Sequence, residues 1–87
     1  MGKYKIEIKR SAVKEIKKLP AQDLKNVLAK IESLSENPRP TDSVKLSGEE
    51  KYRLRCGHYR ILYLIENEYL IVFVVKVGHR KDVYKDR

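Results

Sequence analysis

Arginines and lysines gathered on one face of a strand can hold a phosphate, and the residues best placed to do so lie between 51 and 60. Cationic and apolar side chains alternate over 51–56, a period of two that predicts a half-buried strand. Gly57-His58 then fits a two-residue hairpin loop of type II′, because glycine occupies its first central place. The chain resumes as an apolar-rich strand over 59–65.

This hairpin sets a register that places like charges opposite each other. With Gly57-His58 as the loop, Arg55 faces Arg60 across the ladder. Such a pair costs on the order of several tenths of a kcal/mol, which favours a site built for an anion over a face built for solubility. Arginine suits this role because it holds phosphate oxygens through two parallel hydrogen bonds. The predicted cationic face consists of Lys51, Arg53, Arg55 and Arg60.

The alternative for these residues is a solvated face whose arginines fan apart or pair with Glu49 and Glu50. The end of the chain supports the interpretation as an anion site. The basic segment 76–81 contains Arg80, and Tyr84 follows four residues after it. An aromatic ring beside a basic groove is typical of base stacking, which contributes about 1 to 3 kcal/mol per base. A tail residue pinned on the core is the simpler interpretation of Tyr84.

Composition limits the partners and cofactors that the chain can use. The 87 residues suffice for one domain spanning 1–87, and 20 Lys and Arg against 12 Asp and Glu give a formal charge of +8. This excess favours an anionic partner such as nucleic acid, an acidic protein or a membrane surface. One cysteine, Cys56, cannot form an intramolecular disulfide, and with His58 and His79 it makes no convincing metal site. We expect no metal and no other cofactor.

Apolar runs are too short for a membrane span. The longest cover 61–65 and 69–75, against the roughly 18 residues that a spanning helix needs. Met1 and the residues after it lead into no apolar signal segment. We therefore expect a cytoplasmic protein with no membrane insertion.

Two periodic patterns in the first half of the chain predict the elements that support the cationic face. Residues 3–9 alternate as a strand, and Ser11 is expected to be the N-cap of a short helix that runs to 19. Pro20 fits the first turn of a second helix, which carries an apolar stripe at helical spacing. That stripe consists of Leu24, Val27, Leu28, Ile31 and Leu34.

The rest of the chain completes an α+β layout. Residues 37–48, rich in proline and small polar residues, are predicted to form a connecting loop. Residues 66–68 make a turn, and 69–77 is so continuously apolar that it is expected to be a central strand covered on both faces. The predicted order is β-α-α-β-β-β, a helical hairpin packed on a small, mostly antiparallel sheet.

Two segments resemble the RelE branch of the RelE/ParE toxin superfamily. They read Tyr-Arg-Leu-Arg-Cys-Gly-His-Tyr-Arg-Ile-Leu-Tyr over 52–63 and Val-Gly-His-Arg-Lys-Asp-Val-Tyr over 77–84. Residues 12–20, ending in Lys-Leu-Pro, are similar to the first helix of that family. The match covers essentially the whole chain and the order of its elements, and it implies the RelE-like microbial RNase fold.

The resemblance implies a ribosome-dependent mRNA endonuclease, an mRNA interferase toxin neutralised by a cognate antitoxin that is RelB-like or of another class. Such toxins enter the ribosomal A site and cut the codon there, with the ribose 2′-hydroxyl attacking the adjacent phosphate and without a metal. Preorganised cations would lower the barrier by stabilising charge on the phosphate oxygens. The implied partners are mRNA in the A site, the ribosome, the antitoxin, and operator DNA only as the toxin–antitoxin complex.

The resemblance also implies roles for single residues. Arg60 and Arg80 match arginines that hold the scissile phosphate and stabilise the transition state, and Arg80 is also a candidate proton donor to the leaving oxygen. Tyr84 matches the C-terminal tyrosine that stacks on the substrate base and orients it. Arg53 and Arg55 stand where well-studied members carry basic residues, often lysines, assigned to proton abstraction and charge stabilisation.

These arginines leave the general base open, because arginine stays protonated in proteins. Lys51 lies on the same predicted face, among cations that favour its neutral form. His79 is the other candidate, because some relatives use histidine and imidazole titrates near neutrality, although a histidine in a Gly-His-Arg turn is more often structural. The choice stays open between Lys51, Arg53 and His79.

Two other functions are compatible with the sequence. One is a ParE-like toxin that poisons DNA gyrase and cleaves nothing itself. Both branches share the Tyr59 to Tyr63 motif, whereas the combination of Arg80 and Tyr84 is usually absent from the ParE-like branch. The other is a catalytically inactive toxin that acts with its antitoxin as a DNA-binding autorepressor, for which basic charge would suffice.

Overall fold

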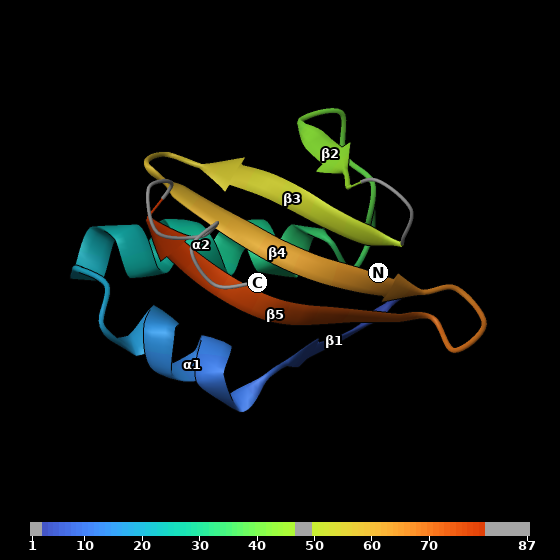
Figure 1. Cartoon of the computed structure of the whole chain (residues 1–87), viewed down its shortest axis with the longest axis horizontal. Helices are drawn as coiled ribbons and strands as arrows, with labels where there is room; N and C mark the ends of the chain where they lie inside the picture. The colour runs from blue at the N-terminus through green and yellow to red at the C-terminus, as the bar shows by residue number, and fades with distance from the viewer. Residues whose placement is uncertain (1–2, 47–49, 80–87) are drawn as a thin grey trace.

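The computed structural model describes residues 3–46 and 50–79, which form two helices and a five-stranded sheet (Figure 1). Buried residues of both helices pack into one cluster with the sheet, so the fold is α+β as predicted. Neither helix of the described residues has the length and apolar character needed to cross a membrane. The elements are β1 (Lys5–Ile8), α1 (Arg10–Lys17), α2 (Ala21–Ser33), β2 (Ser43–Lys45), β3 (Lys51–Cys56), β4 (Tyr59–Glu66) and β5 (Ile71–His79).

The sheet is mixed, with the order β1-β5-β4-β3-β2. β1 runs parallel to β5 and the other neighbours are antiparallel, so the first strand, whose pairing the sequence left open, joins beside the last. β4 is the middle strand and β5 lies between β1 and β4, so the predicted interior place of β5 is confirmed, whereas the prediction that both of its faces are covered was wrong. Val72 and Val74 are buried toward the helices, whereas Ile71 and Phe73 are only half-buried on the other face.

A short strand occupies part of the segment that the sequence predicted to be loop. Ser43–Lys45 pairs with Leu54, Arg53 and Tyr52 of β3, which makes β2 an edge strand. Three residues are too few to show a period, so the pattern could not reveal it. A turn directs it, because the Ser43 backbone N–H and side-chain hydroxyl both donate to the Pro40 carbonyl, at 2.9 and 2.7 Å.

The sheet, rather than a polar cap, sets where the first helix begins. Lys9 is the residue before α1 and makes no side-chain cap, so the prediction of Ser11 as the N-cap was wrong. The Lys9 N–H donates to the Val74 carbonyl at 2.8 Å, and the Lys9 carbonyl accepts the first helical bond from Val13 at 3.0 Å. α2 likewise begins one residue later than predicted, with Pro20 at the capping position.

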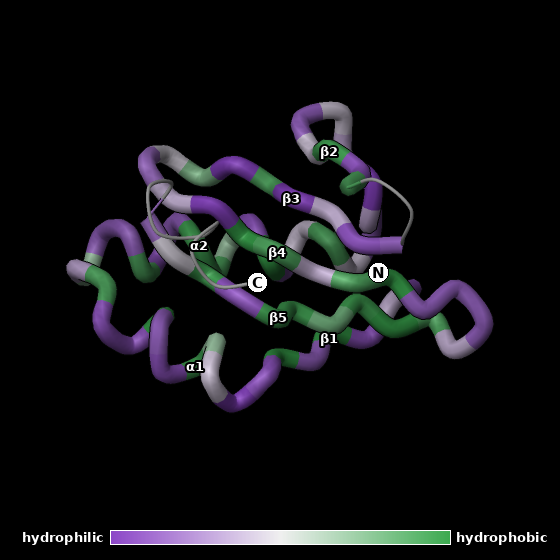
Figure 2. Tube along the Cα trace, in the orientation of Figure 1, coloured by the Kyte–Doolittle hydropathy of each residue, from purple (hydrophilic) through white to green (hydrophobic). Residues whose placement is uncertain are grey.

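The core lies between the two helices and the sheet, where apolar residues line β4 and β5 (Figure 2). Most of the predicted stripe on α2 is confirmed, because Val27, Ile31 and Leu34 are buried. Leu28 is the exception at 42% exposure, so the prediction that it faces the core was wrong. The fully buried side chains with the largest volumes are Tyr63, Leu34, Leu54, Ile61, Val27, Val72, Val74 and Val77.

Tyr63 gives the fold an alkaline limit. Its hydroxyl donates to the Pro38 carbonyl at 2.8 Å, and burial raises the pKa of Tyr63 to about 12. A raised pKa in the folded state contributes stability below the unfolded value near 10, and this is lost as the pH rises through 12. We expect Tyr63→Phe to flatten the fall of the urea midpoint between pH 9.5 and 12. Tyr69→Phe, at a 71% exposed ring, should leave that fall unchanged; equal profiles for all three proteins would contradict this account.

Glu15 on α1 binds β5 at Lys76 and Val77, beyond residues 71–74, with which β1 pairs. One carboxylate oxygen accepts the Val77 backbone N–H at 2.9 Å, and the other lies 2.9 Å from Lys76 Nζ. Because Val77 is buried, Glu15→Ala leaves its N–H unpaired, and we expect a loss of about 1–3 kcal/mol in the free energy of unfolding. Glu32→Ala, at an exposed position of α2, is the control. Urea denaturation checks both variants, and equal losses would contradict the bracing role.

Candidate active site

The β3–β4 hairpin has the register that the sequence predicts. Arg55 pairs with Arg60 and Cys56 with Tyr59, with Gly57-His58 as the loop. Gly57 takes a φ of +62° while His58 is not among the positive-φ residues, which agrees with the type II′ signature. Two guanidinium-bearing residues therefore face each other at the end of the hairpin.

Burial along β3 identifies the face on which its cations lie. Tyr52, Leu54 and Cys56 are buried against the helices, so the alternate residues point to the other face of the sheet. Across the ladder, β3 cations pair with Leu64, Leu62 and Arg60 of β4. The structure thus brings together the four residues of the predicted cationic face, which are Lys51, Arg53, Arg55 and Arg60.

Arg60 carries buried donors that lack a partner within the described residues. Its Nε and Nη1 atoms are out of contact with solvent and make no hydrogen bond within the described part of the chain. Its ladder neighbours are Arg55 on β3 and Gly78 on β5, so neither neighbour offers a carboxylate. Buried donors without a partner are costly, and an incoming anion would relieve that cost.

Glu50 is engaged elsewhere. Its carboxylate lies 3.0 Å from Arg39 and 3.0 Å from Lys45, and these hydrogen bonds, the one from Lys45 first, lower the pKa of Glu50. Arg39 also donates to the Tyr52 hydroxyl at 2.9 Å, which ties this network to the start of β3. The alternative in which Glu50 neutralises the cationic face is therefore not supported, and Glu49 lies outside the described residues.

Of the other predicted site residues, His79 lies apart from the arginines. His79 pairs with Tyr59 on the helix-facing side, where its ring stacks on His58 at 6.2 Å and meets the Tyr59 ring edge-on at 5.9 Å. The cationic face is on the opposite side of the sheet. Arg80 and Tyr84 lie outside the described residues.

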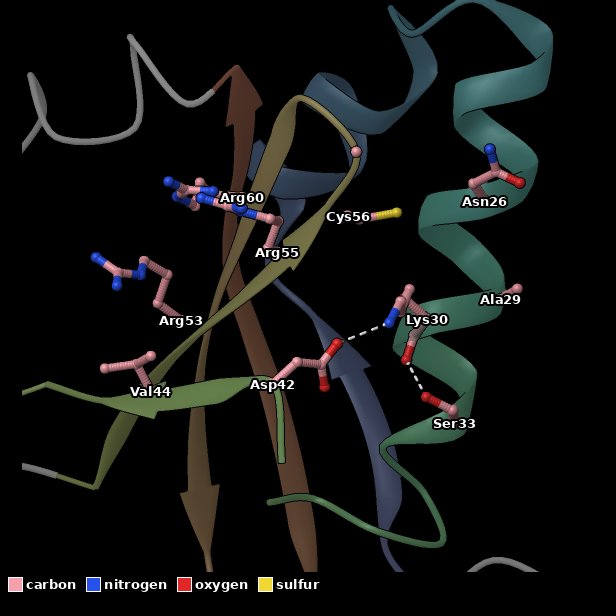
Figure 3. Close-up of a pocket in the computed structure, with 11 residues that line it drawn as sticks. Asn26, Ala29, Lys30, Ser33, Asp42, Val44, Arg53, Arg55, Cys56 and Arg60 are labelled. Carbon is pink, nitrogen blue, oxygen red and sulfur yellow. Dashed lines mark hydrogen bonds and ion pairs between the residues drawn. The ribbon is translucent and has the colours of Figure 1, made fainter. Parts of the chain in front are cut away.

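An open groove of about 860 Å³ crosses the edge of β3 (Figure 3). The arginines of β3 and β4 line one side, and Figure 3 shows their guanidinium groups pointing away from α2. Cys56, predicted to be a core residue, is buried and points toward α2, and burial raises the pKa of its thiol. The sequence did not reveal the α2 side, because no local pattern relates that helix to the segment before β2. The lining residues that it missed include Asn26, Ala29, Lys30, Ser33, Asp42 and Val44.

The α2 side of the groove carries one ion pair. Lys30 Nζ lies 2.9 Å from a carboxylate oxygen of Asp42, and this hydrogen bond lowers the pKa of Asp42. Asp42 therefore remains an anion at neutral pH, and it faces the same groove as three arginines. Within the described ranges no three His, Cys, Asp or Glu side chains converge as metal ligands would.

The amino-acid sequence is similar to those of known toxins. A family model described as the ParE toxin of the type II toxin-antitoxin system parDE matches residues 6–84. A RelE1 protein of Methanocaldococcus jannaschii is 34% identical over 88 residues, which cover 97% of this chain and 98% of the relative. The mRNA interferase toxin RelE of Escherichia coli K12 is 32% identical, with 95% of this chain and 92% of the relative covered.

Solved structures share the fold. The toxin–antitoxin complex RelBE2 of Mycobacterium tuberculosis contains a chain with a TM-score of 0.78 and 30% identity, covering 88% of this chain and 98% of that one. The isolated RelE toxin of E. coli gives a TM-score of 0.78 and 30% identity over 95% of this chain and 93% of its own. The likeness in sequence and in fold extends over nearly the whole chain.

Proposed function

The chain belongs to the RelE/ParE family of toxins of type II toxin–antitoxin systems, and on that premise we propose that it is a ribosome-dependent mRNA endonuclease that cuts codons in the ribosomal A site. Two curated relatives, from E. coli and Shigella flexneri, are named mRNA interferases. The observation that carries the proposal is the arginine pair at the end of the hairpin, in which Arg55 faces Arg60 and two Arg60 nitrogens lack a partner among the residues that the structure describes.

The proposed reaction is a transesterification within the RNA. The ribose 2′-oxygen attacks the adjacent phosphorus, the bond from phosphorus to the 5′-oxygen breaks, and the products carry a 2′,3′-cyclic phosphate and a 5′-hydroxyl. A base takes the proton from the 2′-hydroxyl and an acid returns one to the leaving oxygen. Negative charge grows on the phosphate oxygens, where fixed cationic donors stabilise it without a metal. Arg60, with Arg53 and Arg55 beside it, is proposed to supply those donors.

The general base is proposed among three candidates, Lys51, Arg53 and His79. Lys51 shares the face of the arginines, while His79 lies on the opposite face beside His58, so the arrangement favours Lys51 over His79. Arginine side chains are poor proton acceptors in proteins, so Arg53 is better suited to charge stabilisation. Arg80 as the proton donor and Tyr84 as the stacking ring remain proposals from family resemblance, since neither lies in the described residues.

A cognate antitoxin is the second proposed partner. Solved relatives from E. coli and M. tuberculosis are complexes of RelE-type toxin with RelB-type antitoxin. On this chain, Leu62 and Leu64 stand opposite cations of β3, so the face joins apolar and basic groups. An acidic amphipathic segment that folds on binding fits such a surface, and operator DNA would be bound only by the complex.

The test is translation-coupled cleavage by the purified toxin on programmed ribosomes, run beside a DNA gyrase supercoiling assay. We expect cuts within A-site codons and no inhibition of supercoiling. The description of the matching family as ParE toxin makes gyrase poisoning the second candidate. Inhibited supercoiling with intact mRNA would replace our proposal by that one, and an effect on neither would favour the autorepressor.

A further inference from the structure

The groove across β3 has two sides of opposite character. Arg53, Arg55 and Arg60 line one side, whereas Asp42 lies on the other with its carboxylate directed toward Lys30 (Figure 3). The groove's 860 Å³ falls within the roughly 300–1,000 Å³ of small-molecule sites. It has room for more than the phosphate that the arginines would hold.

Asp42 determines what the second side can accept. Its carboxylate lies 2.9 Å from Lys30 Nζ, and this hydrogen bond lowers the pKa of Asp42, so the side chain is present as a carboxylate in an ion pair. An ionised carboxylate only accepts hydrogen bonds, so it selects groups that donate them. Val44, which pairs with Arg53 and is 45% exposed, also lines the groove and offers an apolar surface beside the arginines. A nucleobase combines both needs, since it has an apolar ring face and donors at its edge.

We propose that the part of the groove lined by Asp42 and Val44 is a base subsite, which takes adenine, cytosine or guanine next to the scissile phosphate and discriminates against uracil. The first three bases carry an exocyclic amino group that can donate to the Asp42 carboxylate. Uracil presents carbonyl oxygens on either side of its one ring N–H, and a carboxylate repels these. The inference rests on the proposed endonuclease function, because it extends the same groove from the phosphate to the base.

The competing explanation is that Asp42 serves only to hold Lys30, at 2.9 Å. Two variants separate these roles, because both break the ion pair but only one alters the acceptor. Lys30→Gln keeps the Asp42 carboxylate. Asp42→Asn replaces it with an amide that donates as well as accepts and therefore tolerates uracil.

The experiment measures binding and cleavage in parallel. Non-cleavable 2′-O-methyl hexanucleotides that differ only in cytosine or uracil, at each position in turn, are titrated into the isolated toxin. The same exchange is made in A-site codons on the ribosome. The wild type should favour cytosine by at least about 10-fold at one position, as for a hydrogen bond to a charged group. Lys30→Gln should keep that preference, and Asp42→Asn should reduce it to within about twofold.

Three results would overturn the inference. They are a wild type without base preference, an unchanged preference in Asp42→Asn, or an equal loss in both variants. Protection of the groove by an acidic antitoxin peptide, with no base preference in the oligonucleotides, would assign it to a protein partner instead. Failure to cut mRNA would refute the endonuclease proposal alone, since the binding titration decides the base subsite independently.

Discussion

Replacing Arg60 with alanine is expected to slow A-site mRNA cleavage by about 10²–10³-fold, the usual effect of removing one preorganised donor from a transition state. The Arg60 guanidinium has two nitrogens out of solvent contact that lack a partner within the described residues. A phosphate bound against this guanidinium would supply the acceptors that these donors lack, and the charge that develops on its oxygens would be stabilised there. Single-turnover cleavage on programmed ribosomes measures the change.

Two further variants make this result specific. Arg60→Lys keeps a cation but loses the planar pair of donors, so its rate should lie between the wild type and Arg60→Ala. Arg10→Ala removes an exposed arginine from α1, away from the groove, and should cut at a rate close to that of the wild type. Cleavage by Arg60→Ala at the wild-type rate, in a variant with an unchanged melting temperature, would remove Arg60 from the chemistry.

The second large effect concerns the helix that supports the groove. Ile31 is 2% exposed and packs in the cluster that joins α2 to the sheet, so Ile31→Ala should lower the free energy of unfolding by about 2–5 kcal/mol. Small domains are stable by only about 5–15 kcal/mol, so this is a large share of the total. Urea denaturation gives the loss directly, and thermal melting should fall by roughly 10 °C or more.

Leu28 is the matched control on the same helix. The sequence predicted it to face the core with Ile31, but it is 42% exposed. Leu28→Ala should therefore cost less than about 1 kcal/mol, because both residues are good helix formers and little burial is lost. Equal losses in the two variants would show that α2 packs through a wider face than the structure describes.

The hairpin could be predicted in detail because a local rule fixes it. A two-residue loop with glycine first leaves one register, and the pairing of Arg55 with Arg60 follows from that register. The same rule places the other cations of β3, since side chains alternate along a strand. Local spacing was therefore enough to predict the arginine side of the site.

The rest of the site depends on contacts between distant segments. Asp42 meets Lys30 because the loop before β2 returns past α2, and the three residues of β2 give no periodic signal. The position of His79 could not be predicted for the same reason. The β4–β5 ladder shifts its register between Leu62 and Tyr63, and this shift decides which residues of β5 face the helices. Ser11 failed as a cap because a bond from Lys9 to β5 sets the start of the helix. Tertiary pairing overrode local preference in each case.

The central claim is that the arginine groove promotes attack by a ribose 2′-hydroxyl on the adjacent phosphate of mRNA in the A site. The most direct measurement compares mRNAs whose A-site codon carries ribose or a single 2′-deoxyribose at the cleaved nucleotide, with the ends of the fragments identified by mass spectrometry. We predict that the ribose substrate yields a 2′,3′-cyclic phosphate and a 5′-hydroxyl, and that the 2′-deoxy substrate stays intact. Cleavage of the 2′-deoxy substrate, or fragments ending in a 3′-hydroxyl and a 5′-phosphate, would contradict the claim.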